Sequence, residues 1–362
     1  MAEQSLFESF FSVIWILFFV GFFMYGQKIQ GYIMIIKVRK HLKKLEVMKI
    51  SSRDKLLKKL GEYTSQPQAI EEKVDRAINS FMISPISIDP KGIVPKLGYL
   101  SDTYDDSLKS LVKTIAPKAD NTHLMNLTNL TEVTIGLNNM YRIVRHFYLL
   151  GKKPGGLLSL TQLQFVLPSI MDSAEAYHSS IDAFSKGLSI GDSFGPLVVS
   201  ELQKGLPVSE IVKDTLVSDM DIEGRKVFLV KAKGPGGNVG KPGKAIEKIF
   251  EGQSNVKLVI TIDAALKFEG EQTGQVAEGI GAAIGGLGVE RYQIEESSTK
   301  ASALLYAIVV KMSEKEAITQ IKQEIIKNIT DVKNRVKRII KDKTKTGDYV
   351  IVAGIGNTIG VA

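Results

Sequence analysis

The chain has 362 residues, no cysteine and a formal net charge of +8, with 44% hydrophobic and 24% charged residues. This composition is that of a folded protein and excludes intrinsic disorder for most of the chain. The absence of cysteine excludes disulfides, thiolate nucleophiles and thiolate metal sites. Beyond an N-terminal apolar segment, the remaining length is enough for two domains of ordinary size.

An uncharged apolar run, FFSVIWILFFVGFFMY, occupies residues 10–25. Because roughly 17 to 25 apolar residues cross a bilayer as a helix, we predict a transmembrane anchor over residues 1–36. Glu3 and Glu8 precede the run where a cleaved signal peptide would carry basic residues. Basic residues follow it, at Lys28, Lys37, Arg39, Lys40, Lys43 and Lys44. The positive-inside rule then predicts a single-pass protein of the cell membrane, with its N-terminus outside and its body in the cytoplasm.

The basic segment after the run has two interpretations. It is either a solvated helix face or a strip that contacts anionic membrane lipid, and the predicted anchor favours lipid as a partner. Nucleic acid is not expected as a partner, because the basic residues crowd against the apolar run and no aromatic stacking platform accompanies them. The sequence does not indicate an oligomeric state.

The middle of the chain has the periodicity of helices. Apolar residues recur at three- and four-residue spacing in residues 40–60, 68–82, 120–150 and 157–186. We therefore predict a helical cytoplasmic domain over residues 37–187. Within it, the proline-rich segment 83–100 predicts an extended connection rather than a helix. No histidine of this region has the spacing of a zinc site, so we predict no metal ligands here.

After residue 188, short β-branched runs alternate with glycine-rich loops and helical segments. This pattern is typical of an α/β domain with a mostly parallel sheet, which we predict over residues 188–362. The predicted strands are 226–232, 256–263, 304–311 and 348–357. In such sheets, ligands bind at the carboxyl ends of the strands, where loops and helix N-termini converge.

Three glycine-rich segments belong to this domain: GPGGNVGKPG, GEQTGQVAEGIGAAIGG and GIGNTIG. Tight turns alone would explain any one of them, but their accumulation predicts close approach of backbone to a ligand. None forms a Walker A loop or a dinucleotide fingerprint, and the residues do not identify a cofactor. The candidate ligand-binding residues are Gly236, Gly237, Asn238, Gly270, Glu271, Gly281, Gly285, Gly354, Gly356 and Asn357.

Two aspartates are candidate catalytic residues. Asp263 ends an apolar strand, where a carboxylate gains little from packing, and Asp192 opens a predicted helix, where N-capping is the alternative role. Two adjacent carboxylates cannot both ionise easily, so such a pair can act as acid and base on a bound water. Alternatively, the same oxygens bind Mg²⁺, with phosphate on neighbouring backbone N–H groups.

Short motifs carry a resemblance to a known superfamily. GIGN at 354–357, DSFGP at 192–196 and IDAAL at 262–266 resemble motifs of the spore germination protease and hydrogenase maturation protease superfamily. The resemblance implies an α/β fold with Asp192 and Asp263 as its acidic pair. Because GIGN stands last here, the order resembles a circular permutation that brings Asn357 close to Gly191. The histidine metal ligand of the hydrogenase branch has no counterpart, since no histidine follows residue 178.

The whole chain also resembles an archaeal family of membrane-anchored proteins catalogued as a domain of unknown function (DUF1512). GPGGNVGKPGKAIE, IDAALKFEGE and GIGNT carry this resemblance. Together the patterns predict a membrane-anchored, peptidase-like hydrolase that acts on a peptide or protein. The alternative is a non-enzymatic membrane-tethered scaffold or ligand sensor that binds a phosphate or small metabolite at the glycine-rich loops.

Overall fold

The computed structural model describes residues 2–64, 70–85 and 92–362. These residues form two compact units. The first consists of Met1–Ser51 and Gly136–Ala174, and the second of Ser52–Ile135 and Glu175–Ala362. The second unit contains the β-sheet and all of the candidate site residues. The domain boundaries predicted from the sequence stay a prediction.

The N-terminal half of the chain is helical, as its periodicity predicts. Its helices are α1 (Ala2–Gly61), α2 (Ile70–Ile78), α3 (Ile93–Ile115), α4 (Asn121–Gly151) and α5 (Leu157–Lys186). Four of them coincide with the predicted stretches. The exception is α3, which begins inside the segment predicted to be an extended connection.

α3 forms despite the prolines that precede it. Pro95 lies in the first turn of the helix, where a proline removes no hydrogen bond. Leu108, Val112 and Ile115 then follow at helical spacing and are buried. The prediction of an extended connection is therefore wrong from residue 93 onward, and residues 86–91 lie outside the described residues.

The prediction of a transmembrane anchor over residues 1–36 is wrong. In the part of the chain that the structure describes, no helix combines the length and the apolar character needed to cross a membrane. The uncharged run at residues 10–25 lies in α1, but Lys28 and Gln30 soon follow. The apolar segment is thus interrupted before the roughly 20 residues that a spanning helix needs. The predicted cell-membrane localisation and its single-pass topology depended on this anchor and are wrong with it.

The second unit holds a seven-stranded sheet with the order β1-β2-β3-β7-β4-β6-β5. The strands are β1 (Ser209–Val212), β2 (Thr215–Ile222), β3 (Arg225–Ala232), β4 (Val256–Leu266), β5 (Val276–Ile280), β6 (Leu304–Met312) and β7 (Tyr349–Gly354). The four predicted strands correspond to β3, β4, β6 and β7. β1, β2 and β5 were not predicted.

The sheet is mixed, so the prediction of a mostly parallel sheet is wrong. β3, β7, β4 and β6 are parallel to one another, whereas β1 and β2 at one edge and β5 at the other pair antiparallel. The edge strands escape a search for apolar runs because their sequences are short and polar, such as SEIV and VAEGI. Tight turns join β1 to β2 and β2 to β3, with positive φ angles at Asp214, Glu223 and Gly224.

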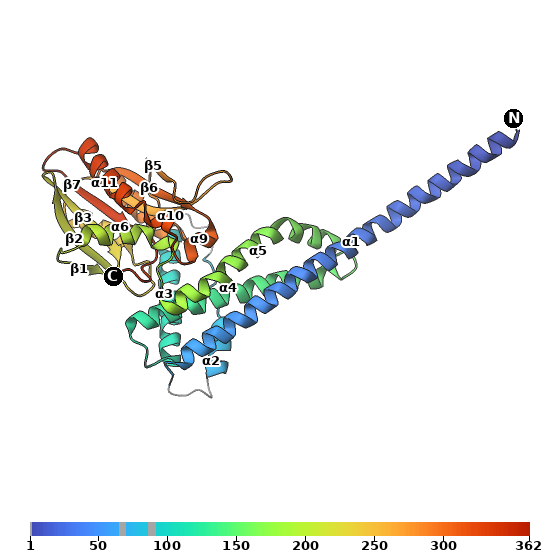
Figure 1. Ribbon diagram of the computed structural model, residues 1–362, viewed down its shortest axis with the longest axis horizontal. Helices are drawn as coiled ribbons and strands as arrows, with labels where there is room; N and C mark the ends of the chain where they lie inside the picture. The colour runs from blue at the N-terminus through green and yellow to red at the C-terminus, as the bar shows by residue number, and fades with distance from the viewer. Residues whose placement is uncertain (1, 65–69, 86–91) are drawn as a thin grey trace. The chain divides into compact units, whose positions relative to one another are not determined.

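Helices cover both faces of this sheet. α6 (Phe194–Gln203) and α11 (Ile329–Lys343) pack on one face, and Figure 1 shows them on the same side. α7 (Pro242–Gly252) and α8 (Val289–Lys300) pack on the other. Alternate strand residues supply the two cores, as expected when both faces are buried. The short helices α9 (Glu314–Ile318) and α10 (Gln323–Ile326) precede α11.

The last strand of the chain lies in the middle of the sheet. β7 is inserted between β3 and β4, so the residues that follow it emerge among the carboxyl ends of the parallel strands. The start of α6 packs directly against these ends, because a Cβ atom added to Gly195 would lie 2.3 Å from the carbonyl oxygens of both Ile262 and Ile355. Only glycine permits this contact, which brings the beginning of α6 to the sheet edge.

Candidate functional site

A cavity of about 630 Å³ lies at the carboxyl ends of β4 and β7. Asp192 and Asp263 both line it, together with Gly356 after β7. The loop 282–288 and the first turn of α8 form another wall, and residues of α3 complete the lining. The structure therefore brings the two predicted catalytic aspartates, which are far apart in the sequence, to one cavity.

Asp263 is the more buried member of the pair. Its side chain is at the carboxyl end of β4 and is 6% exposed. The Oδ1 atom accepts a hydrogen bond of 2.7 Å from the backbone N–H of Ala264. Burial raises the pKa of Asp263 well above its ordinary value, and the negative charge of Asp192 raises it further, against the N–H groups of Ala264 and Gly285. These influences favour the protonated form of Asp263.

Asp192 lines the same cavity. It lies in the 3₁₀ turn η2 (Gly191–Ser193), which leads into α6. Its Oδ2 atom accepts a hydrogen bond of 2.8 Å from the backbone N–H of Asn357. The structure thus gives this carboxylate a partner after β7 in place of the N-cap contact considered from the sequence. Burial raises the pKa of Asp192, and the N–H of Asn357 opposes that rise by stabilising the charged form.

The two carboxylates form an electrostatically coupled pair. Within the described residues, no neighbouring cation lowers the pKa of either one. A negative charge on one carboxylate makes ionisation of the other harder, because like charges repel and no cation in the described part of the chain offsets the repulsion. Carboxylates that lie close enough to share one proton can polarise a water molecule held between them.

Gly356 fixes the position of Asp192 relative to β7. Its φ angle is +124°, and a Cβ atom there would lie 1.9 Å from the carbonyl oxygen of Asp192. Any side chain would push apart the turn that carries Asp192 and the strand end that follows β7. The glycine is therefore needed for the pair to face one cavity.

The segment GGN at residues 236–238 is held to α4 and to the residues after β7. Asn129 of α4 donates from Nδ2 to the carbonyl oxygen of Gly237, at 2.6 Å. The Oδ1 atom of the same Asn129 accepts a hydrogen bond from the side chain of Asn357, at 3.2 Å. Asn126 accepts a further one from the N–H of Gly237, at 2.8 Å. One asparagine of α4 thus links both glycine-rich loops and supports the backbone that holds Asp192.

Family comparisons place the whole chain in one family. The model described as "Protein of unknown function (DUF1512) N-terminal domain" matches residues 12–187, and that described as "Domain of unknown function (DUF1512) C-terminal" matches residues 190–362. The chain belongs to the DUF1512 family. No curated protein and no solved structure matches it.

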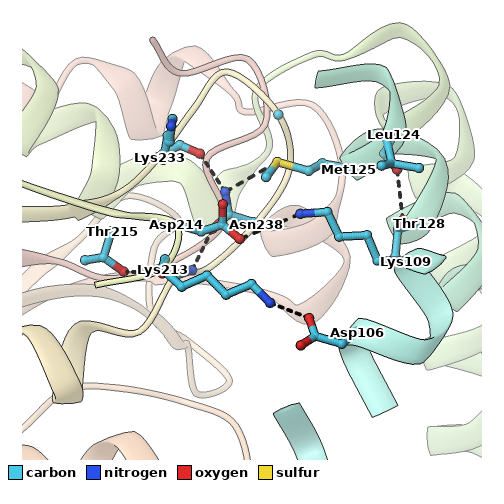
Figure 2. A network of polar contacts seen from close by, with 12 residues as sticks. Asp106, Lys109, Leu124, Met125, Thr128, Lys213, Asp214, Thr215, Lys233 and Asn238 are labelled. Atoms are coloured by element: carbon cyan, nitrogen blue, oxygen red, sulfur yellow. Dashed lines mark hydrogen bonds and ion pairs between the residues drawn. The ribbon is translucent and has the colours of Figure 1, made fainter. Parts of the chain in front are cut away.

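The candidate ligand-binding residues of this DUF1512 protein fall into separate places. Gly285 and Gly356 line the cavity of the aspartate pair. Gly237, Asn238 and Asn357 line a second cavity of about 450 Å³, where their polar groups are largely used within the chain. Figure 2 shows Asn238 directed at the sulfur of Met125 and the carbonyl oxygen of Lys233.

The other five candidates line neither cavity among the described residues. Gly236 packs against Met125, and Gly354 against Gly195, in contacts too close for a Cβ atom. Glu271 accepts a hydrogen bond from the N–H of Phe268 and pairs with Lys311 at 3.4 Å. Gly270 and Gly281 are in loops outside both linings. The structure therefore places the two aspartates and two of the candidate glycines at one cavity, and it places the other candidates elsewhere.

Several charged residues of the site were not predicted. α3 supplies Asp102 and Asp105 to both cavities, and their three-residue spacing would have been a signal had α3 been predicted. Glu132 of α4 lines the second cavity, where burial, followed by the charge of Asp105, raises its pKa to about 7. Glu290 of α8 accepts a hydrogen bond of 2.6 Å from the N–H of Gly243 at the start of α7.

Metal binding was the alternative use of the aspartate pair. Across residues 2–64, 70–85 and 92–362, no group of three or more histidine or acidic side chains is arranged to hold a metal ion. The Mg²⁺ alternative stays a prediction.

The raised pKa of Asp263 predicts a pH-dependent effect on stability. A carboxyl whose pKa is higher in the folded than in the unfolded state favours folding below its unfolded pKa of about 3.9, and this contribution is lost as pH rises through the folded pKa. Asp263→Asn cannot ionise, so we expect a higher free energy of unfolding than wild type at pH 7, and a difference that shrinks as pH falls to 4. Urea unfolding across this range measures it.

Asp342→Asn, on the exposed side of α11, is the matched control and should follow the wild-type pH dependence. A stability change in Asp263→Asn that is the same at every pH would contradict the raised pKa of Asp263.

Proposed function

We propose that this DUF1512 protein is a hydrolase that uses Asp192 and Asp263 as an acid–base pair on a peptide bond. The observation that carries the proposal is that the two carboxylates line one cavity. They come from different elements, and the charge of Asp192 raises the pKa of Asp263 with no neighbouring cation among the described residues to offset it. Paired carboxylates of this kind activate water for hydrolysis.

The contacts of the two side chains suggest separate roles. Asp192 accepts the N–H of Asn357, which stabilises its charged form, so it is the general base that takes a proton from water. Asp263 is buried beside that charge and keeps its proton, so it is the general acid. The hydroxide oxygen then bonds to the carbonyl carbon, the C–N bond breaks, and Asp263 gives its proton to the leaving amine.

The resemblance to germination proteases supports a peptide as substrate. The motifs DSFGP, IDAAL and GIGN contribute Asp192, Asp263 and Gly356 to one cavity, and the insertion of β7 between β3 and β4 accommodates the permuted order. The cavity volume of about 630 Å³ is within the range of small-ligand sites and suits a few residues of an extended chain. Ala264, Ile284 and Leu287 give it an apolar wall beside the carboxylates.

The contacts give less support to the alternative, a scaffold or sensor that binds phosphate or a small metabolite at the glycine-rich loops. Lys241 and Lys244, the basic residues of the first loop, both pair with Asp102. The N–H groups of Gly237 and Gly240 donate to Asn126 and Asn238. An incoming phosphate would have to displace these partners.

The test uses the purified full chain and an unbiased peptide library in ¹⁸O-labelled water. We expect new peptide termini carrying ¹⁸O with the wild type, and at least about 10²-fold slower cleavage with Asp192→Asn or Asp263→Asn. Asp342→Asn serves as the control for a contaminating protease. Equal cleavage by all four proteins, or none by the wild type, would contradict the proposal. In the latter case, thermal stabilisation by a phosphate compound would favour the sensor.

A further inference from the structure

The N-terminal half of α3 covers the cavity of the aspartate pair. Gly98, Ser101, Asp102 and Asp105 line that cavity, and their spacing of three and four residues places them on one face of the helix. The helix also approaches α8 closely, because a Cβ atom added to Gly98 would lie 3.1 Å from Cγ1 of Val289. Access to the two carboxylates therefore depends on where this half of α3 lies.

The two halves of α3 differ in how they are anchored. Its buried residues are Leu108, Val112 and Ile115, all toward the C-terminal end. No residue of α3 before Leu108 is buried, and Tyr99 is 71% exposed. The apolar side chains of the half that covers the cavity, Ile93, Val94, Leu97 and Leu100, are only half-buried, so they resist local opening less than the buried residues of the other half.

Ion pairs help to hold the N-terminal half of α3 in place. Asp102 pairs with Lys244 at 2.9 Å and with Lys241 at 2.5 Å, both at the start of α7. Figure 2 shows the next ion pairs along the helix. The carboxylate of Asp106 pairs with Lys213, and the ammonium group of Lys109 pairs with Asp214 at 3.7 Å. Lys213 and Asp214 form the turn between β1 and β2.

The ion pair of Asp106 with Lys213 can break at low cost. Asp106 and Lys213 are 60% and 59% exposed, and pairs at such positions are weak and screened by salt. The pairs of Asp102 with Lys241 and of Lys109 with Asp214 are half-buried, with side chains 25% to 33% exposed. A helix whose buried apolar side chains all lie toward one end, and whose other end is held by partly exposed ion pairs, can lift at the weaker end.

We propose that residues 93–106 of α3 form a lid over the cavity, latched by the pairs of Asp102 and Asp106 with the start of α7 and the turn between β1 and β2, and that substrate enters when the latch opens. The inference rests on the proposed function for the identity of what enters. The lid itself does not, and its motion is measurable without any substrate.

Charge reversal and charge exchange test the latch. Asp106→Lys places like charges together, so amide hydrogen exchange in residues 93–105 should be about two- to five-fold faster than in wild type, the scale of one exposed ion pair. Asp106→Lys with Lys213→Asp restores an attractive pair and should restore slow exchange. Exchange in α11 serves as the internal control for global unfolding. Equal exchange in all three proteins, or no recovery in the double variant, would overturn the latch.

A disulfide tests whether the lid controls entry. The chain has no cysteine, so Gly98→Cys with Val289→Cys introduces one defined pair. We expect peptide cleavage to be lost on oxidation and to return on reduction. Unchanged cleavage by the oxidised protein would overturn the lid while leaving the hydrolase proposal intact. A latch that behaves as expected in a protein that cleaves no peptide would uphold the lid and overturn the hydrolase.

Discussion

Asp263→Asn is expected to lower kcat/KM for peptide cleavage by about 10²- to 10⁴-fold, the usual contribution of a positioned general acid. Asparagine keeps the shape of the side chain but cannot supply the proton that the leaving amine needs. Asp192→Asn should cause a loss of the same order, because it removes the base. The double variant should be little worse than either single one, since the two carboxylates act as a unit.

The pH–rate profile adds a second readout. Activity requires Asp192 ionised and Asp263 protonated, so the rate should fall at low pH as Asp192 takes up a proton and at high pH as Asp263 loses one. The high-pH limb lies above the ordinary range of aspartate because burial and Asp192 raise the pKa of Asp263. Glu290→Gln is the control from the same cavity, since glutamine can still accept the N–H of Gly243. A loss in Glu290→Gln as large as that in Asp263→Asn would contradict the assigned pair.

Gly356→Ala is expected to lower the free energy of unfolding by about 3 kcal/mol or more. The added methyl group would lie 1.9 Å from the carbonyl oxygen of Asp192, and the φ angle of +124° is one that side chains rarely adopt. Overpacking of a tight contact and strain at such a backbone angle each cost about 1 to 3 kcal/mol. Urea denaturation of the variant and the wild type at one pH measures the difference.

Gly285→Ala is the matched control for this substitution. Gly285 lines the same cavity, but a Cβ atom there would meet nothing within 4 Å and its φ angle is not in the positive region. We therefore expect a change within about 0.5 kcal/mol, as for open positions in general. Equal losses in the two variants would show that the close packing of Gly356 on Asp192 does not hold the site together.

The central strands could be predicted from sequence, and the edges could not. β3, β4, β6 and β7 are buried on both faces, so they appear as continuous β-branched runs. β1 and β5 pack on one side only and carry polar residues, so their sequences contain no continuous apolar run. The mixed character of the sheet depends on these edge strands, which is why the prediction of a mostly parallel sheet failed.

The N-terminal prediction failed for a different reason. A strongly aromatic run at residues 10–25 weighs heavily in any estimate of apolar character, but it is followed by Lys28 and Gln30 in the same helix. The length of an uninterrupted apolar segment decides whether a helix can cross a membrane, rather than the hydrophobicity at its centre. The described part of α1 does not meet that criterion.

The sequence indicated the two aspartates as candidates, but it did not indicate the residues that surround them. Asp263 ends the apolar run from which the strand was predicted, and the resemblance of DSFGP and GIGN to protease motifs pointed to Asp192 and Asn357. Nothing local indicates that Asn129 of α4 would bind Gly237 and Asn357, which lie more than a hundred residues later. The same holds for Asp102, whose helix was hidden by the prolines before it.

Carbon-13 NMR of the aspartate carboxyl groups tests the central claim most directly. The resonances of Asp192 and Asp263 are assigned by their loss in the two Asn variants and followed from pH 3 to pH 9. We predict that Asp263 titrates well above the usual aspartate range and that its titration moves to lower pH in Asp192→Asn. Independent titration of both groups in the ordinary range, unchanged when the other is replaced, would contradict a shared proton in one cavity.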